Sequence, residues 1–594
     1  MARVDAGRGE RPGDAARNGG HPPAPLREAE LPVRDRRGAA RGSGPHLLPG
    51  EPVTLGEDSL RADRAGASRD EALPGGSPQP REDGKRGARG ADRPAASSGL
   101  TEAAVFSASD ALYEGLIDFL RDGDADALTH SELEARLDVD GRALLRQLYE
   151  DHLLLRAEHE KRAENVIDEN GVAHCAIESG HQRVLETIFG PVRVSRLAYR
   201  QIGTENRYLQ DAALNLPKER HSHGLRERSA IEATRGSYAE AQVALARSTG
   251  VELGKRQVEE LTRRAAKDVE DFYAQAKREP AEVSNVLVLS ADGKGIVMRP
   301  EALRVETKRA AASSEHRLET RLSKGEKKNR KRIAELACVY DCEPVARAPA
   351  DILARSGDRA RKEAPVAKAK WLTASVVEDA RKVIAAAFDE GERRDPEHKR
   401  TWIALVDGAK HQIDVINSEA RRRGIEITVI VDFVHVLEYL WRAAWCFFSE
   451  GDPAVEEWVA DKALAVLSGK AGTVAGALSR KATMLGLEDA KKNKVDESVA
   501  YLKHKQPYLD YPSALANGWQ IATGIIEGSC RHLVRDRFDI TGARWGLEGA
   551  EAMLKLRAVR SNGDWAAYWQ YHLAHAHQRV HASRYAGGVI PQAA

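Results

Sequence analysis

The sequence predicts an α/β core that follows a helical region and a long polar N-terminal tail. Three observations support this fold class. Short apolar runs with β propensity occur between residues 285 and 431, and two of them end on aspartate. Helical patterns alternate with the later runs, as they do where helices cover a sheet. Residues 1–100 contain no Phe, Trp, Tyr, Ile or Cys, so they are expected to be disordered.

Composition excludes some classes of protein. The 594 residues allow several domains. Lys and Arg total 91 against 90 Asp and Glu, so the net charge of +1 does not by itself indicate a nucleic-acid partner. The five scattered cysteines favour reduced thiols. No secretory signal and no apolar run of about 20 residues is found, so we expect a soluble cytoplasmic protein without a membrane partner.

Helical patterns dominate the next region, which we assign to residues 101–180. Two amphipathic stretches lie around 112–120 and 144–155. Two strands around a Gly-Pro turn follow, at 184–189 and 192–199. The sequence therefore predicts a small β element between two helical regions.

Residues 181–283 contain this β-hairpin and then a region that resembles a helix-turn-helix. In such a motif the last helix enters the DNA major groove, and the exposed Lys255 and Arg256 would suit phosphate and base contacts there. An ordinary helical bundle with a charged solvated face explains the pattern equally well. The three predicted helices are 226–234, 237–248 and 254–274.

The core is expected to begin in residues 284–448. Its first strand ends at Asp292, where an Asp-Gly step predicts a hairpin. A later strand ends at Asp407. In order, we predict strands to 292, 295–298 and 333–340, helix 371–388, the strand to 407, helix 410–423, strand 425–431 and a helix after Asp432. This is the element order of a ribonuclease H-like domain, in which the first and fourth strands are adjacent.

The remaining residues are predicted to complete this core. Residues 449–515 read as an all-helical insertion, and residues 516–594 as the core completion with C-terminal helices. Glu527 opens a helix in this last part. Three convergent carboxylates, Asp292, Asp407 and Glu527, would suit Mg²⁺, which prefers oxygen ligands, and two-metal phosphoryl transfer.

Each acidic residue alone is weak evidence, because Asp-Gly after a strand is more often a turn. The ordered trio is stronger evidence. Asp432 is a favoured N-cap residue, so Asp432 and His435 have a structural interpretation as well as a functional one. Lys294 and His411, which flank Asp292 and Asp407, likewise have both a structural and a functional interpretation. The auxiliary candidates are therefore Asp432, His435, Lys294 and His411.

Two groups of basic residues are candidates for DNA contacts. Arg531 and Arg535 follow Glu527 at intervals of four, which predicts a shared helical face. The alternatives are an ion pair with Glu527 and a contact with DNA phosphates; we favour the second. The other group lies in the basic run 321–332, which we place between the second and third core strands. Its candidates are Lys327, Lys328, Arg330, Lys331 and Arg332.

Three sequence motifs carry a family resemblance. They are Asp292-Gly-Lys-Gly, Asp407-Gly-Ala-Lys-His and Gly524-Ile-Ile-Glu527-Gly-Ser-Cys-Arg. With them the chain resembles DDE transposases of bacterial insertion sequences, most closely the ISKra (ISKra-four) group related to Mutator-like transposases, over roughly residues 180–575. Asp432-Phe-Val-His435 resembles a motif that lies near the active site in Mutator-like enzymes.

The resemblance implies a specific chemistry. Asp292, Asp407 and Glu527 would bind two Mg²⁺ or Mn²⁺ ions, and the enzyme would cleave DNA at transposon ends and join those ends to target DNA. The implied partner is double-stranded DNA, both terminal inverted repeats and target. Pairing two ends implies at least a homodimer on DNA. A ribonuclease H-like nuclease or resolvase without strand transfer, and an inactive sequence-specific DNA-binding protein, remain the alternatives.

Overall fold

The structure is a computed structural model, and it describes residues 102–313, 323–353, 362–540 and 542–592. The described residues belong to one compact unit. The predicted tail, residues 1–100, lies outside them. In the part of the chain that the structure describes, no helix is both long and apolar enough to cross a membrane.

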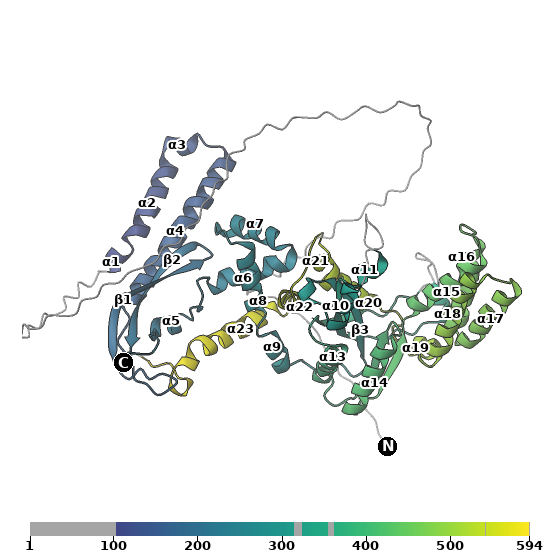
Figure 1. The fold of residues 1–594 in the computed structure, drawn as a ribbon. Helices are drawn as coiled ribbons and strands as arrows, with labels where there is room; N and C mark the ends of the chain where they lie inside the picture. Colours follow the sequence, from purple (N-terminus) through teal and green to yellow (C-terminus); the bar gives the residue numbers. More distant parts are fainter. Residues whose placement is uncertain (1–101, 314–322, 354–361, 541, 593–594) are drawn as a thin grey trace, which may run out of the picture. The chain divides into compact units, whose positions relative to one another are not determined.

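The N-terminal helices form a hairpin that packs on a two-stranded sheet (Figure 1). Leu153 lies against Leu185, Val192 and Val194 of the strands. The strands pair in antiparallel fashion, which confirms the predicted β-hairpin, although the first strand begins earlier than expected. The elements are α1 Glu102–Val105, α2 Ser107–Arg121, α3 Gly123–Asp126, α4 His130–Glu158, β1 Ala176–Thr187 and β2 Gly190–Arg200.

The predicted three-helix region contains more helices than expected. The first two predicted helices are confirmed, and Gly250 ends the second in the left-handed conformation. The third, 254–274, is wrong as one helix, because it breaks at 266–268, where the carboxylate of Asp268 is drawn into contacts with His572 and Arg579. The helices are α5 Leu209–Ala213, α6 His223–Arg235, α7 Tyr238–Thr249, α8 Lys255–Ala265 and α9 Val269–Gln275.

A mixed five-stranded sheet forms the centre of the α/β core, with the strand order β5-β4-β3-β6-β7. Strand β3 is parallel to β6, and β6 is parallel to β7, whereas β4 is antiparallel to both of its neighbours. The first and fourth strands are therefore adjacent, as predicted. The strands are β3 Val286–Val297, β4 Lys331–Cys342, β5 Ala367–Ser375, β6 Trp402–Val406 and β7 Ile427–Val431.

The predicted hairpin at Asp292 is wrong. Strand β3 continues through Asp292-Gly293, and Asp292 lies opposite Leu336 in an unbroken antiparallel ladder with β4. The predicted second strand, 295–298, is therefore the end of the first strand. The local turn preference of Asp-Gly is overridden here, because a turn would give up the ladder hydrogen bonds on both sides of it.

The predicted helix 371–388 is also wrong at its start. Trp371 lies in the edge strand β5, opposite Val339 of β4, and the helix begins only at Ala380. The side chain of Asn562 accepts a hydrogen bond from the backbone N–H of Leu372 and donates one to its carbonyl. These tertiary contacts satisfy the strand backbone in a way that local sequence does not reveal.

Helices surround the sheet and extend beyond it. Helix 410–423 is confirmed, and a helix does begin after Asp432. The predicted insertion is helical throughout its described elements. The helices are α10 Val305–Ala312, α11 Lys324–Lys328, α12 Pro349–Leu353, α13 Ala380–Arg394, α14 Lys410–Arg423, α15 Phe433–Phe447, α16 Ala454–Leu467, α17 Ala471–Met484, α18 Asp489–Lys505, α19 Tyr511–Ala516, α20 Gly524–Cys530, α21 Asp536–Phe538, α22 Leu547–Ser561 and α23 Trp565–Val580.

Candidate metal centre

Three aspartates lie at one end of the sheet, because β3, β6 and β7 run in the same direction. The last register pair of β3 and β6 is Ser290 with Leu405, and Asp292 and Asp407 each lie two residues farther along their chains. Asp432 directly follows β7, and its backbone N–H donates to the carbonyl of Val406. Parallel strands thus bring the three acidic residues to a common edge of the sheet.

The carboxylate of Asp292 is held on both oxygens. Oδ1 accepts from the backbone N–H of Gly293 at 2.6 Å, and Oδ2 accepts from the thiol of Cys530 at 3.1 Å. Burial and the adjacent negative charge of Asp292 raise the pKa of this thiol, so it remains a protonated donor. Cys530 ends α20, one turn after Glu527. The hydrogen bond therefore ties the glutamate helix to β3.

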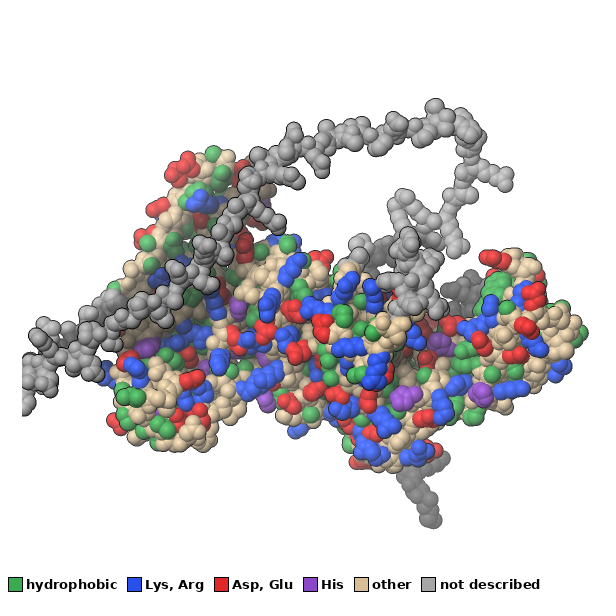
Figure 2. Space-filling model, viewed as in Figure 1, with side chains coloured by type: hydrophobic (Ala, Val, Ile, Leu, Met, Phe, Trp, Pro, Cys, Tyr) green, Lys and Arg blue, Asp and Glu red, His purple; other side chains and the backbone are tan. Residues whose placement is uncertain are grey.

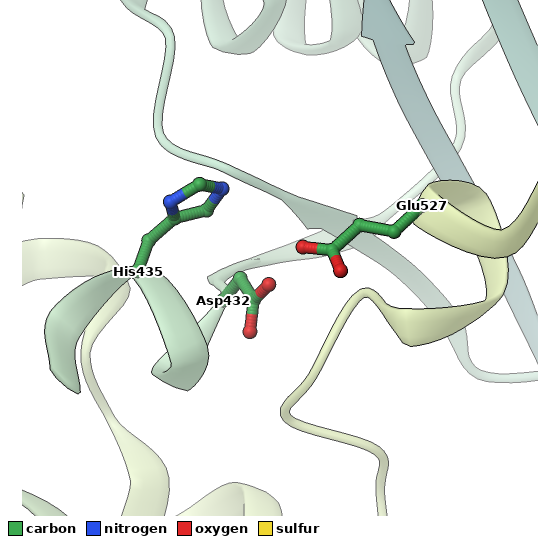
Figure 3. A group of neighbouring side chains, drawn as sticks. All are labelled: Asp432, His435 and Glu527. Carbon is green, nitrogen blue, oxygen red and sulfur yellow. The ribbon is translucent and has the colours of Figure 1, made fainter. Parts of the chain in front are cut away.

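Glu527 meets Asp432 and His435 in the structure (Figure 3). One potential ligand atom from each of the three side chains lies within 4.8 Å of the others. Glu527 is exposed, and its side chain extends from α20 toward the start of α15. Carboxylates and imidazole together could hold a divalent cation.

Asp432 is fixed by its own hydrogen bonds. It is fully buried, its Oδ1 accepts from the N–H of Val434 at 2.8 Å, and its Oδ2 accepts from the hydroxyl of Thr523. The N-cap interpretation is therefore confirmed. The Thr523 contact also joins the segment before α20 to the start of α15, so the cap contributes to the position of Glu527.

His435 is a half-buried imidazole among carboxylates. Burial alone would lower its pKa, but the hydrogen bond to Glu438 at 3.1 Å and the charges of Asp432 and Asp407 raise the pKa above its usual value. The neighbouring carboxylates therefore favour the protonated form of His435. When it is protonated, the imidazole partly balances the charge of these carboxylates.

The predicted trio does not form a single compact cluster. Among the described residues, the group of ligand atoms in mutual range contains Glu527 but neither Asp292 nor Asp407. Asp407 is also oriented locally, since its Oδ1 accepts from the N–H of Ala409 at 2.8 Å. The hydroxyl of Tyr501, from the helical insertion, donates to the Asp407 carbonyl at 3.3 Å. The insertion thus contacts the site directly.

Sequence reasoning missed one acidic neighbour. Glu335 lies on β4 opposite Gly293, and burial together with the nearby charge of Asp292 raises its pKa. No local motif marks it, because its position depends on the β3–β4 register. The two flanking candidates are exposed: the charge of Lys294 acts on Cys530, and that of His411 acts on Glu335. Both therefore lie near the Asp292 end of the site.

The two arginines after Glu527 do not follow one regular α-helix. The α-helix ends at Cys530, and residues Arg531–Arg535 form a π-helical turn. The single regular α-helix on which the spacing argument depends therefore ends before Arg531. Both arginines are exposed. In the described structure Arg531 approaches Asp536 at 3.9 Å, and no ion pair with Glu527 is found.

The basic run lies between β3 and β4, that is, between the first and second core strands rather than the second and third. Lys327, Lys328, Arg330 and Lys331 are exposed. Arg332 differs, because its guanidinium donates to the backbone carbonyls of Val376, Ala302 and Val377. It therefore has a structural role. Over the middle of the face in Figure 2, Lys and Arg side chains alternate with carboxylates. Arg321 lies outside the described residues.

The basic side chains of α8 fall into two groups. Lys255 and Arg256 are exposed at the start of α8 and line a groove of about 1010 Å³ together with Arg299. Farther along α8, Arg263 pairs with Glu260 and Glu548, and Arg264 pairs with Glu260 and Glu219. Only the first group keeps its charges available in the described structure.

Comparison with known proteins gives no family assignment. No protein-family model matches the chain, and no curated protein matches it.

Proposed function

We propose that the chain is a DNA transposase with a ribonuclease H-like core. The observation that carries the proposal is that Asp292 and Asp407 each lie two residues beyond the last register pair of two adjacent parallel strands, with the glutamate helix tied to Asp292 through Cys530. The family resemblance of the three motifs supports the same assignment. The partners would be terminal and target double-stranded DNA, with at least two copies of the chain on paired ends.

The donor set fits Mg²⁺ or Mn²⁺. Glu527 is exposed, and its carboxylate has no hydrogen bond or ion pair within the described residues, so both oxygens are free to bind. Asp292, Asp407 and Glu527 would hold the ions, and all offer hard oxygen ligands. When bound, two such ions would activate an attacking hydroxyl and stabilise the leaving oxygen of a phosphodiester.

The chain's own residues would bind and orient DNA around this centre. The exposed Arg531 and Arg535 follow Glu527 directly and would contact phosphates nearest the reacting group. His435, when protonated, would offset part of the acidic charge. The basic residues 327–331 and the start of α8 would bind the DNA backbone farther away.

The test is a DNA cleavage and joining assay with the full chain. The substrates are fragments that carry the DNA ends flanking the coding sequence, with Mg²⁺ or Mn²⁺ supplied. Asp292→Asn, Asp407→Asn and Glu527→Gln should each lower cleavage by at least about a thousandfold. Asp414→Asn is the matched control, because Asp414 is an exposed acidic residue that pairs with Lys410 on α14.

Each outcome has a defined meaning. Cleavage followed by joining to a target plasmid supports a transposase. Cleavage without joining would indicate a nuclease or resolvase instead. Metal-dependent cleavage that survives all three substitutions would reject the proposed site.

A further inference from the structure

The helical hairpin of α2 and α4 carries an uncovered apolar face. Four large side chains on it are substantially exposed: Tyr113 by 56%, Leu145 by 48%, and Leu120 and Leu148 by 39% each. On α2 the only buried side chain is that of Ser109. The described part of the chain therefore leaves these apolar side chains in water, which is unfavourable for a contiguous group.

These side chains form one continuous stripe. On α2, Tyr113, Ile117 and Leu120 recur at the spacing of one helical face, and on α4 the residues at 137, 141, 145 and 148 do the same. Two contacts align the helices in antiparallel fashion. The N–H of Ser109 donates to Asp151 at 3.3 Å, and the Arg136 guanidinium lies 4.9 Å from the centre of the Phe119 ring. This alignment sets the two rows side by side.

The middle of the stripe is shaped for close approach. Position 141 is glycine within a long helix, where glycine costs about 1 kcal/mol relative to alanine. A Cβ atom at Gly141 would meet nothing within 4 Å. The flat surface there is therefore not required by packing inside the described chain, and it would let another helix approach α4 closely.

Two other occupants are disfavoured. DNA is a poor fit, because α2 and α4 together carry more Asp and Glu than Lys and Arg. The N-terminal 100 residues are a poor fit as well, because they contain no Phe, Trp, Tyr or Ile to fill an apolar face. A protein surface of similar apolar character is needed.

We propose that a second copy of this chain covers the stripe, so that two hairpins form an intermolecular four-helix bundle. Two helices about 10 Å wide, one about 22 Å and the other about 43 Å long, present a face on the order of 600 Å². This lies within the range of stable interfaces, which is roughly 600–1,000 Å² per partner. A twofold axis would place the same stripe on both sides. The dimer does not depend on the proposed function and would form without DNA.

The test is the oligomeric state of the full chain without DNA, measured by sedimentation velocity across micromolar concentrations. The wild-type chain should be a dimer. Leu145→Glu combined with Leu148→Glu should raise the dimer dissociation constant by more than about a hundredfold, and Tyr113→Lys on α2 should weaken the dimer independently. Met484→Glu is the control, because Met484 is 86% exposed on a distant helix, and it should leave the dimer intact.

Circular dichroism will establish that the variants keep their helices, which is expected because the substituted side chains are exposed and glutamate and lysine favour helices. A monomeric wild-type chain would overturn the inference, because a second copy of the chain would then not cover the stripe. A dimer that survives the stripe substitutions would overturn it equally, because its interface would lie elsewhere.

Discussion

The thiol of Cys530 donates a hydrogen bond to Oδ2 of Asp292 at 3.1 Å, across 238 residues of sequence. The same carboxylate accepts from the N–H of Gly293 through its other oxygen. Cys530 is buried and lies on the helix that carries Glu527. This weak hydrogen bond thus contributes to the relative position of two proposed metal ligands. Sulfur is a poor donor, and its contribution is testable because serine can replace it.

We expect Cys530→Ala to weaken Mn²⁺-dependent DNA cleavage by roughly fivefold, since loss of one hydrogen bond costs about 1 kcal/mol. The shift should also be seen as a higher Mn²⁺ concentration for half-maximal activity. Cys530→Ser keeps a donor and should largely restore both values. Cys446→Ala is the control, because Cys446 is buried on α15 and its thiol donates a hydrogen bond to the backbone carbonyl of Arg442. If Cys530→Ala cleaves DNA as well as the wild-type chain does, Cys530 does not position the metal ligands.

Lys255 and Arg256 should contribute to DNA binding through charge. Replacing both with Gln should weaken binding across sequences and reduce the slope of log affinity against log salt by about 2. The measurement is fluorescence anisotropy over a salt series. Arg263→Gln with Arg264→Gln is the comparison, because both arginines are already paired with glutamates, and it should change the slope less. Equal slopes for the two double variants would contradict a DNA contact at the start of α8.

Asp268 should stabilise the fold in a pH-dependent way. Burial alone would raise its pKa, but hydrogen bonds from His572 and Arg579 lower it to about 2. The pKa in the unfolded chain is near 3.8, so the stabilisation is present above that value and is lost as pH falls from about 4 to about 2.

We therefore expect Asp268→Asn to lower the free energy of unfolding by roughly 2 kcal/mol at pH 7, measured by urea denaturation. The difference from wild type should shrink below about pH 4. Asp271→Asn is the control, because Asp271 is exposed on α9, the helix that Asp268 precedes. If the free energies of unfolding of wild type and Asp268→Asn differ by the same amount from pH 7 to pH 3, the ionised carboxylate of Asp268 is not the cause of the difference.

Gly518 should be required for the segment that leads to the glutamate helix. Its φ is +76°, and a Cβ there would lie 2.4 Å from the backbone N of Val345, which donates to the Gly518 carbonyl. Gly518→Ala should lower the midpoint of thermal unfolding, with a cost above about 1 kcal/mol. Gly486→Ala is matched, because Gly486 has φ of +58° with nothing within 4 Å. If both variants have the same midpoint of thermal unfolding, the close approach of Gly518 to the backbone of Val345 does not contribute to stability.

Part of the site could be predicted because the signal is local. Asp407 and Asp432 each follow a short apolar strand, and parallel pairing then brings such strand ends together. The sequence places Asp292 in the first strand, as the structure confirms, but its Asp-Gly step predicts a hairpin that does not form. Pairing with β4 keeps the chain extended at Asp292-Gly293, and β4 lies more than 30 residues away in the sequence.

Other features have no local signal. Trp371 lies in a run that favours a helix, yet contacts with β4 and Asn562 make it part of a strand. The π turn after Cys530 likewise ends the regular α-helix that the spacing of Arg531 and Arg535 predicts. The meeting of Glu527 with Asp432 and His435 depends on the return of the chain after a helical insertion. The motif Asp432-Phe-Val-His435 was a hint of that contact, not a prediction of it.

We propose that Asp292, Asp407 and Glu527 hold the metal ions. Calorimetric titration of the full chain with Mn²⁺ tests it directly, because the structure offers a second group, Asp432, His435 and Glu527. We predict that the wild-type chain binds two ions, that Asp292→Asn weakens binding by at least about tenfold, and that His435→Gln leaves it nearly unchanged. Loss of binding in His435→Gln with retention in Asp292→Asn would contradict the claim.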